Sequence, residues 1–317
     1  MYREKKISLV IPAYNEERLI KPTLENVPAV IDRVFVVNDG SKDRTAEVVA
    51  EAASRDPRVE LVNHAKNSGV GQAIITGYLR SLAEGYDIAV VVGGDFQMPL
   101  EQVADFLDPL IDGKADYAKG NRFLIEGNVF EDMPKIRQLG NAVISLVTKI
   151  ASGYYKVYDV VDGYTAITKH AIAMINWRQA WKKYGYPMDF LIRLNAYGLR
   201  VKDIPRRAIY LKGERQSQIK GFNYALKVSP MLLRGFFWRL FKKYLFRDFH
   251  PLLFFYLTGL LLFPVGLVWS CVLLWWQIAG QGVTGPQATL ASVFLIMGFV
   301  SLSFGMMFDM YDNIERE

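Results

Sequence analysis

Cysteine is almost absent from this chain of 317 residues, and histidine is scarce. The single cysteine, Cys271, lies inside an apolar run, and the chain has only three histidines. We therefore expect neither a disulfide framework nor a zinc site built from Cys and His. The N-terminal residues MYREKK lead straight into a predicted strand, without the apolar segment of a secretory signal. We expect the soluble part of the chain to stay in the cytosol.

Charge is missing from two long apolar stretches near the C-terminus, residues 252–276 and 288–308. Each is long enough to span a bilayer, so we predict a transmembrane hairpin joined by the uncharged connector 277–287. Basic residues gather before the first stretch, and the positive-inside rule places that side, and the tail 309–317, in the cytosol. The alternative is a buried helix pair of a soluble protein.

Residues 222–249 mix aromatic with basic side chains. A helix with these groups on opposing faces is suited to the headgroup layer of a membrane. A nucleic-acid face would have similar ingredients, but the apolar stretches that follow favour a membrane, and we expect no nucleic-acid partner. The net charge of +6 is modest. The sequence thus divides into a cytosolic domain (1–215), an interfacial segment (216–250) and a two-span hairpin with a short tail (251–317).

The first two thirds of the chain alternate strands with helices. Short apolar runs predict strands, and segments with helical spacing follow them. The predicted strands are 7–11, 34–37, 59–63, 88–92 and 201–205, and the predicted helices include 19–30, 45–53 and a segment from 67 to about 84. This alternation is typical of an α/β domain with a mainly parallel, Rossmann-like sheet and helices on both faces.

Polar turns follow three of these strands, with the sequences PAYNEE, NDGSKD and GGDFQM, and a glycine-containing turn, NSGVGQA, opens a helix. Ligands of open α/β sheets bind outside the carboxyl ends of the strands. Asp95 and Gln97 follow Gly93 and Gly94 at such an end. A carboxylate and an amide oxygen suit a hard divalent cation that carries a diphosphate. A polar turn without a ligand is the alternative.

In this order the four turns resemble the nucleotide-sugar-binding half of family 2 glycosyltransferases, which have the GT-A fold, over roughly residues 5–215. The resemblance implies that Asp95 binds Mg²⁺ or Mn²⁺ with the help of Gln97. It also implies a donor site in which Pro12, Tyr14 and Glu16 line the base and ribose pocket and Asp39 closes on it. Gly69 and Gly71 would allow close approach of the backbone to the nucleotide.

One residue departs from the family pattern. The family usually has Asp-x-Asp, and here Gly93 stands at the first of these positions. A single carboxylate should hold the cation less tightly and leave more of its coordination to diphosphate and water. A degenerate, inactive site is the alternative.

A second group of residues resembles the phosphate-binding side of dolichyl- or polyprenyl-phosphate hexose synthases. Arg122 ends a predicted strand that starts near Asp116, and a helix follows to about Ala151. The resemblance implies that arginines here face phosphates, for which the guanidinium fork is suited. The implied acceptor and phosphate residues are Arg122, Arg137, Asn141, Arg215, Ser217 and Lys220. The segment 213–220 lacks the family's usual glycine between Arg and Ser, and Arg137 fits a solvated helix surface equally well.

Two carboxylates complete the predicted catalytic set. Residues 159–167 resemble the family's acceptor-side loop, which contains Asp162, and Asp189 opens a helix. In relatives with hydroxyl acceptors, an acid near the position of Asp189 acts as a general base. A phosphate acceptor is already anionic, so we expect Asp162 and Asp189 to orient substrates. A helix N-terminal carboxylate favoured by the helix dipole is the alternative for Asp189.

Together these features predict an inverting, metal-dependent transfer of a hexose from a GDP-mannose or UDP-glucose type donor to a polyprenyl phosphate, dolichyl or undecaprenyl. The catalytic residues would be Asp95, Gln97, Arg122, Asp162 and Asp189. Two alternatives remain: a glycosyltransferase with a hydroxyl acceptor, on a lipid or polysaccharide, or a catalytically silent membrane subunit of a glycosylation complex. The expected partners are the nucleotide sugar, the polyprenyl phosphate and membrane lipid. A homo-oligomer is left open.

Overall fold

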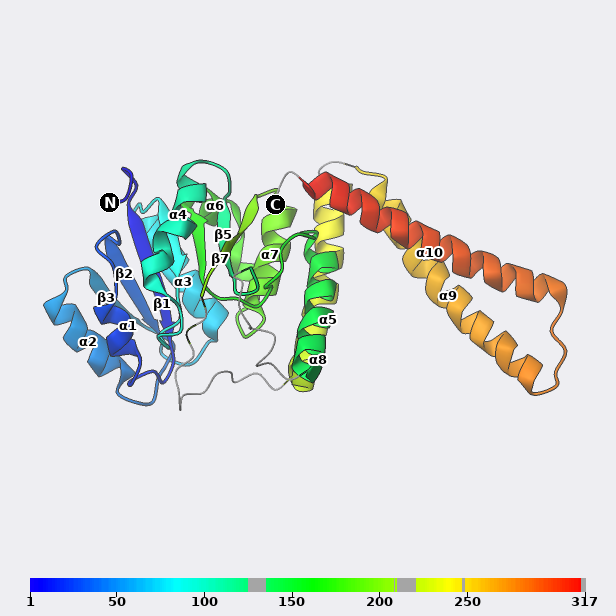
Figure 1. The fold of residues 1–317 in the computed structure, drawn as a ribbon, viewed down its shortest axis with the longest axis horizontal. Coiled ribbons are helices and arrows are strands. Elements are labelled where there is room, and N and C mark those ends of the chain that lie inside the picture. The colour runs from blue at the N-terminus through cyan, green and yellow to red at the C-terminus, as the bar shows by residue number, and fades with distance from the viewer. Residues whose placement is uncertain (125–134, 208, 210–220, 247–248, 315–317) are drawn as a thin grey trace. The chain divides into compact units, whose positions relative to one another are not determined.

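A computed structural model describes residues 1–124, 135–207, 209, 221–246 and 249–314. The chain forms two compact units, Met1–Phe236 and Phe237–Glu315 (Figure 1). The first unit contains the sheet, and the second contains the two long apolar helices. The domain boundaries expected above stay a prediction.

Seven strands of the described residues form one sheet, in the order β3-β2-β1-β4-β6-β5-β7. All neighbours pair in parallel except β6, which runs antiparallel to both β4 and β5. The strands are β1 (Ile7–Ala13), β2 (Arg33–Asn38), β3 (Val59–Asn63), β4 (Ile88–Val91), β5 (Tyr117–Asn121), β6 (Thr165–Thr168) and β7 (Val201–Pro205). The mainly parallel α/β fold predicted from the sequence is confirmed.

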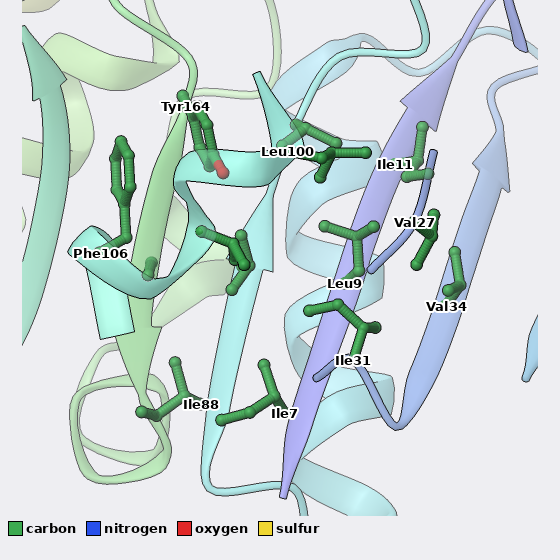
Figure 2. Close-up of a cluster of buried hydrophobic side chains, with 14 of the residues drawn as sticks. Ile7, Leu9, Ile11, Val27, Ile31, Val34, Ile88, Leu100, Phe106 and Tyr164 are labelled. Carbon is green, nitrogen blue, oxygen red and sulfur yellow. The ribbon is translucent and has the colours of Figure 1, made fainter. Parts of the chain in front are cut away.

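Helices cover both faces of the sheet. In β1, Ile7, Leu9 and Ile11 point to one face, where they meet the apolar side chains of α4 (Val103–Ile111) and its surroundings (Figure 2). Val10 points to the other face, because successive side chains of a strand alternate, and it packs against α3 (Val70–Ala83). The other helices of this unit are α1 (Ile20–Glu25), α2 (Thr45–Arg55), α5 (Lys135–Ser152), α6 (Lys169–Met174), α7 (Tyr186–Ala196) and most of α8 (Gly221–Arg239).

Two sequence-based element predictions need correction. The helix expected over residues 19–30 ends at Glu25. Pro28 accounts for the early end, because the residue before a proline is pushed out of the helical region. Residues 159–167 were expected to form a loop, but Thr165 begins β6. A four-residue antiparallel strand is too short to carry a clear periodic signal.

In the second unit, α9 (Leu252–Ile278) and α10 (Gly285–Asn313) lie side by side and antiparallel (Figure 1). Both are candidate membrane spans by length and hydropathy, and most of their side chains are exposed. Glycines make the contact close, since a Cβ at Gly298 would lie 2.3 Å from the backbone nitrogen of Phe263, and one at Gly266 would lie 2.3 Å from that of Leu295.

A buried polar cluster joins the start of this unit to the end of α10. The guanidinium of Arg239 donates to both carboxylate oxygens of Asp309, at 2.8 and 2.7 Å, and the hydroxyl of Tyr244 donates to the same carboxylate at 2.7 Å. Lys243 donates to Asn313 at 2.6 Å. Arg239 and Lys243 are therefore not on an exposed basic face of the 222–249 segment, where we had expected them. They serve as buried partners of α10.

Candidate active site

The strand directions bring several chain segments to one edge of the sheet. The carboxyl ends of β1, β2 and β4 share an edge because these strands are parallel. Strand β6 is antiparallel to β4 and to β5, so β5 and its parallel partner β7 also end there, whereas β6 begins there. Residues after β4, β5 and β7, and residues before β6, thus meet at this edge.

The turns that follow β1 and β2 are hydrogen-bonded to each other. The backbone nitrogen of Asn15 donates to the hydroxyl of Ser41 at 3.0 Å, and the nitrogen of Lys42 donates to the side-chain oxygen of Asn15 at 2.8 Å. The nitrogen of Glu16 donates to the hydroxyl of Thr45, at the start of α2, at 2.8 Å. Residues 15–19 and Asp43 line a polar hollow here. Glu16 is the predicted donor residue that lines it.

Two predicted donor residues lie in the turn after β1, and a third lies near the end of the strand itself. Pro12 is in β1, paired with Val37, while Tyr14 is exposed and Glu16 is partly buried. Tyr184, which the sequence did not single out, is close to Glu16. Partial burial raises the pKa of Tyr184, and the charges of Glu16 and Asp95 raise it further.

Asp39 is buried and holds the loop that precedes α3. Its carboxylate accepts hydrogen bonds from the backbone nitrogens of Ser68 at 2.9 Å and Gly69 at 2.8 Å, and it lies 2.7 Å from Nδ1 of His64. At Gly69 and Gly71 the backbone that comes close belongs to residues 181–182: a Cβ would lie 2.4 Å from the carbonyl oxygen of Lys182 and 2.5 Å from that of Trp181, respectively.

Asp95 lies in the turn after β4, with Phe96 next to it in the left-handed region (φ 55°). Burial raises the pKa of the Asp95 carboxyl, while the backbone nitrogen of Gln97 and the charge of Arg206 act in the opposite direction. The carboxylate leans over Gly93, where a Cβ would lie 2.8 Å from Oδ1 of Asp95. The missing side chain at position 93 leaves the space that this carboxylate occupies.

The oxygens of Asp95 and Gln97 match the hard donors that Mg²⁺ and Mn²⁺ prefer. Among the described residues, no group of three or more His, Cys, Asp or Glu side chains forms a metal-binding cluster. The donor set therefore fits a cation that takes its remaining ligands from a diphosphate and water, and it does not fit a cation held by protein alone.

Arg122 is oriented by buried carboxylates. Its Nε and Nη2 donate to the two oxygens of Asp159 at 2.6 and 2.9 Å, and its Nε lies 3.3 Å from Oδ2 of Asp162. Both carboxylates are fully buried, whereas the Arg122 side chain is 27% exposed. The buried carboxylates thus fix the orientation of the guanidinium. A fixed orientation is suited to a group that binds a ligand at the sheet edge.

Arg206 also contacts Asp162, and the sequence analysis missed it. Its Nε and Nη2 lie 2.8 and 2.7 Å from Oδ2 of Asp162. Arg206 follows β7 just as Arg122 follows β5. A charged residue directly after a predicted strand was the signal that could have identified it.

Of the remaining predicted residues, only Asp189 has a side chain that the structure describes. Asp189 is buried in the first turn of α7, where it pairs with Arg193 (2.7 Å) and accepts from the backbone nitrogen of Trp181 (2.8 Å). These contacts are those of a structural carboxylate. Arg137 and Asn141 belong to α5, but their side chains lie outside the described part of the chain. Residues Arg215, Ser217 and Lys220 lie outside the described residues altogether.

Residues 8–184 match the model of glycosyl transferase family 2. The chain belongs to this family. This glycosyltransferase is 31% identical to a UDP-N-acetylglucosamine–dolichyl-phosphate N-acetylglucosaminyltransferase of Methanococcus voltae. The match covers 65% of this chain and 87% of the relative. It is 27% identical, over 62% and 75% of the two lengths, to the polyprenol monophosphomannose synthase of Mycolicibacterium smegmatis.

Among solved structures, this glycosyltransferase is similar to the glucosyl-3-phosphoglycerate synthase of Mycobacterium tuberculosis in complex with Mn²⁺, UDP-glucose and phosphoglyceric acid. The TM-score is 0.55, with 18% identity over 74% of this chain and 80% of that one. At this identity the likeness supports the fold, which agrees with the GT-A architecture expected from the sequence.

Proposed function

We propose that this glycosyltransferase transfers a hexose from a nucleotide sugar to a polyprenyl phosphate, with Mg²⁺ or Mn²⁺ and with inversion at the anomeric carbon. The observation that carries the proposal is Arg122, whose guanidinium is held by Asp159 and Asp162 at the sheet edge where Asp95 also lies. A fixed guanidinium suits a phosphate, and the site then holds a phosphate-binding group beside a cation-binding one.

Two further observations support a lipid-linked acceptor. Relatives are named for transfer to dolichyl phosphate, polyprenol phosphate and undecaprenyl phosphate. The chain also has two candidate membrane spans, which would keep the active site near a lipid substrate. The named relatives differ in the sugar they transfer. The transfer assay should therefore include UDP-N-acetylglucosamine as a donor, in addition to donors of the UDP-glucose and GDP-mannose types.

In this mechanism a phosphate oxygen of the acceptor attacks the anomeric carbon as the bond to the donor diphosphate breaks, and the nucleoside diphosphate leaves with the electron pair. Asp95 and Gln97 would hold the cation, which neutralises charge on the leaving diphosphate. Arg122 binds phosphate and offsets the repulsion between donor and acceptor anions. The acceptor phosphate is already anionic, so no protein base has to remove a proton.

The contacts of Asp189 argue against a hydroxyl acceptor that would need this residue as a base. Its carboxylate is engaged by Arg193 and by the backbone of Trp181. A general base has to reach the proton that it removes. The phosphate acceptor, which needs no such base, is therefore the better supported substrate.

The test uses the full-length protein in detergent with a short polyprenyl phosphate, Mg²⁺ or Mn²⁺, and labelled UDP- and GDP-sugars. We expect label from one donor to enter the organic phase, and Asp95→Asn to reduce that transfer at least about a hundredfold. The matched control, Asp105→Asn, changes an exposed carboxylate of α4 and should keep full activity. Donor binding without lipid labelling would reject the phosphate acceptor, and full activity of Asp95→Asn would reject the cation site.

A further inference from the structure

Arg206 is a buried arginine at the active-site edge of the sheet, directly after β7. Only 5% of the residue is exposed. Its Nη1 donates to the carbonyl oxygen of Arg207 at 3.0 Å, and its Nε and Nη2 both approach Oδ2 of Asp162. All three guanidinium nitrogens of Arg206 thus have partners within the protein, and two of them contact Asp162.

Asp162 is shared by two guanidinium groups. Its Oδ2 lies 2.7 Å from Nη2 of Arg206 and 3.3 Å from Nε of Arg122, while its Oδ1 accepts from the backbone nitrogen of Tyr164 at 2.8 Å. The carboxylate is fully buried. Loss of Arg206 would leave a buried charge with its strongest partner removed, and the carboxylate would shift toward the remaining guanidinium.

The strand beneath this pair leaves space for it. Gly120 is in β5, and a Cβ there would lie 2.8 Å from Oδ1 of Asp162 and 3.0 Å from Cδ of Arg206. A side chain at this position would force Asp162 or Arg206 to shift from the place that it occupies. The absence of a side chain at position 120 is thus a second observation, independent of the hydrogen bonds, that favours the pair.

Arg207, the neighbour of Arg206, points outward instead. It pairs at 3.3 Å with Glu101, and both side chains are well exposed.

We propose that Arg206 is a positioning residue of the transfer site: it holds Asp162 and, through this shared carboxylate, fixes the phosphate-binding guanidinium of Arg122. The role assigned to Arg122 rests on the proposed function, whereas the shared carboxylate does not. A residue that acts through Arg122 should matter only while Arg122 is present. This dependence separates positioning from a general effect on stability.

The test is a double-mutant cycle on the full-length protein, with Arg206→Met and Arg122→Gln alone and together. The readout is the dissociation constant for farnesyl phosphate, a short polyprenyl phosphate, together with kcat and KM for transfer. In the wild-type background we expect Arg206→Met to weaken acceptor binding about tenfold, and in the Arg122→Gln background less than about twofold. Arg206→Lys should recover part of the loss, because it keeps the charge but not both contacts. Arg207→Met, the matched control, should bind as the wild type does.

Equal losses in both backgrounds, or an effect of Arg206→Met no larger than that of Arg207→Met, would overturn the role of Arg206. If the wild-type protein binds no farnesyl phosphate, the proposed acceptor fails, and the same cycle is then measured on hydrolysis of the donor. If the two substitutions are coupled in their effect on donor hydrolysis, Arg206 is still a positioning residue, although the proposed acceptor is wrong. If their effects on hydrolysis are additive, the role of Arg206 is rejected. Unfolding temperatures show whether each variant has kept its fold. If Arg206→Met has lost it, the cycle is measured with Arg206→Lys instead.

Discussion

At the scale of single residues, Asp159 is a carboxylate kept charged inside the protein. Burial raises its pKa, but the hydrogen bonds and charge of Arg122, together with the charge of Lys119, outweigh burial, so the pKa lies below its ordinary value. Such a group stabilises the fold at neutral pH. That stabilisation is lost as the pH falls below the ordinary carboxyl range and through the lowered pKa.

Asp159→Asn tests this linkage. Near pH 7 we expect it to destabilise the protein by on the order of 3 kcal/mol, because it removes one partner of a buried ion pair. The difference from the wild type should stay constant down to about pH 5 and shrink below about pH 4, where the carboxyl group of the unfolded wild-type chain takes up a proton. Thermal unfolding in detergent across this range measures it. A difference that grows on acidification would contradict the direction of the pKa shift.

Gly93 permits a test of the single-carboxylate site. The atom that a new Cβ would crowd is Oδ1 of Asp95, the end of a flexible side chain, so Gly93→Asp should be accommodated by rotation of Asp95. A second carboxylate adds a ligand, and we expect Mn²⁺ to bind about tenfold more tightly in the presence of UDP or GDP. Titration of free Mn²⁺ by electron paramagnetic resonance measures this without any turnover.

Gly93→Ala is the matched control, because it adds the same Cβ without a ligand. It should leave the Mn²⁺ affinity near that of the wild type or lower it. Equal affinities of the Asp and Ala variants would mean that position 93 does not face the cation.

At the scale of elements, the close contact of α9 with α10 depends on glycine. A Cβ at Gly298 would meet the backbone of Phe263, which cannot move aside as a side-chain end can. Small residues allow such close approach of helices in membranes, where no hydrophobic effect drives their association. We expect Gly298→Leu to destabilise the hairpin by on the order of 3 kcal/mol.

Thermal unfolding of the detergent-solubilised protein checks this expectation. Gly282→Leu, in the connector where a Cβ meets no neighbour, is the control and should unfold at the wild-type temperature. If the two variants unfold alike, the glycine contact is not a source of stability.

Some strands of the sheet could be predicted from the sequence and one could not. Residues 59–63 and 201–205 were predicted as strands with the bounds that the structure gives them. Strand β6 was missed, and with it the reversal that places Asp162 at the same edge as Asp95. Its pairing with β4 and β5 depends on partners far along the chain, which local patterns do not contain.

At the scale of the whole molecule, the hairpin predicts one topology for the chain. The buried bonds from Arg239 to Asp309 and from Lys243 to Asn313 put the start of this unit beside the end of α10. Both ends of the hairpin should then lie on one side of the membrane. The positive-inside rule favours the cytosolic side for the basic segment, and the connector would face the opposite side.

Cysteine labelling in intact cells tests this topology. In a Cys271→Ser background, Gln281→Cys in the connector should react with an impermeant maleimide. Lys114→Cys, an exposed position of the first unit, should react only after the membrane is opened. The reverse pattern would invert the orientation, and labelling of both sites in intact cells would contradict the hairpin.

The sequence by itself determined the elements and motifs of this protein that depend on near neighbours. These are the apolar strands, the polar turns that carry Asp95 and Gln97, the position of Arg122 after a strand, and the two uncharged helices. Only the tertiary structure decided which of these groups meet. Arg206 is joined to Asp162, and Arg122 to Asp159, by contacts across 44 and 37 positions of the chain. Asp189, expected near the substrates, is paired with Arg193. Such partners are set by strand order and burial, which are properties of the folded chain as a whole.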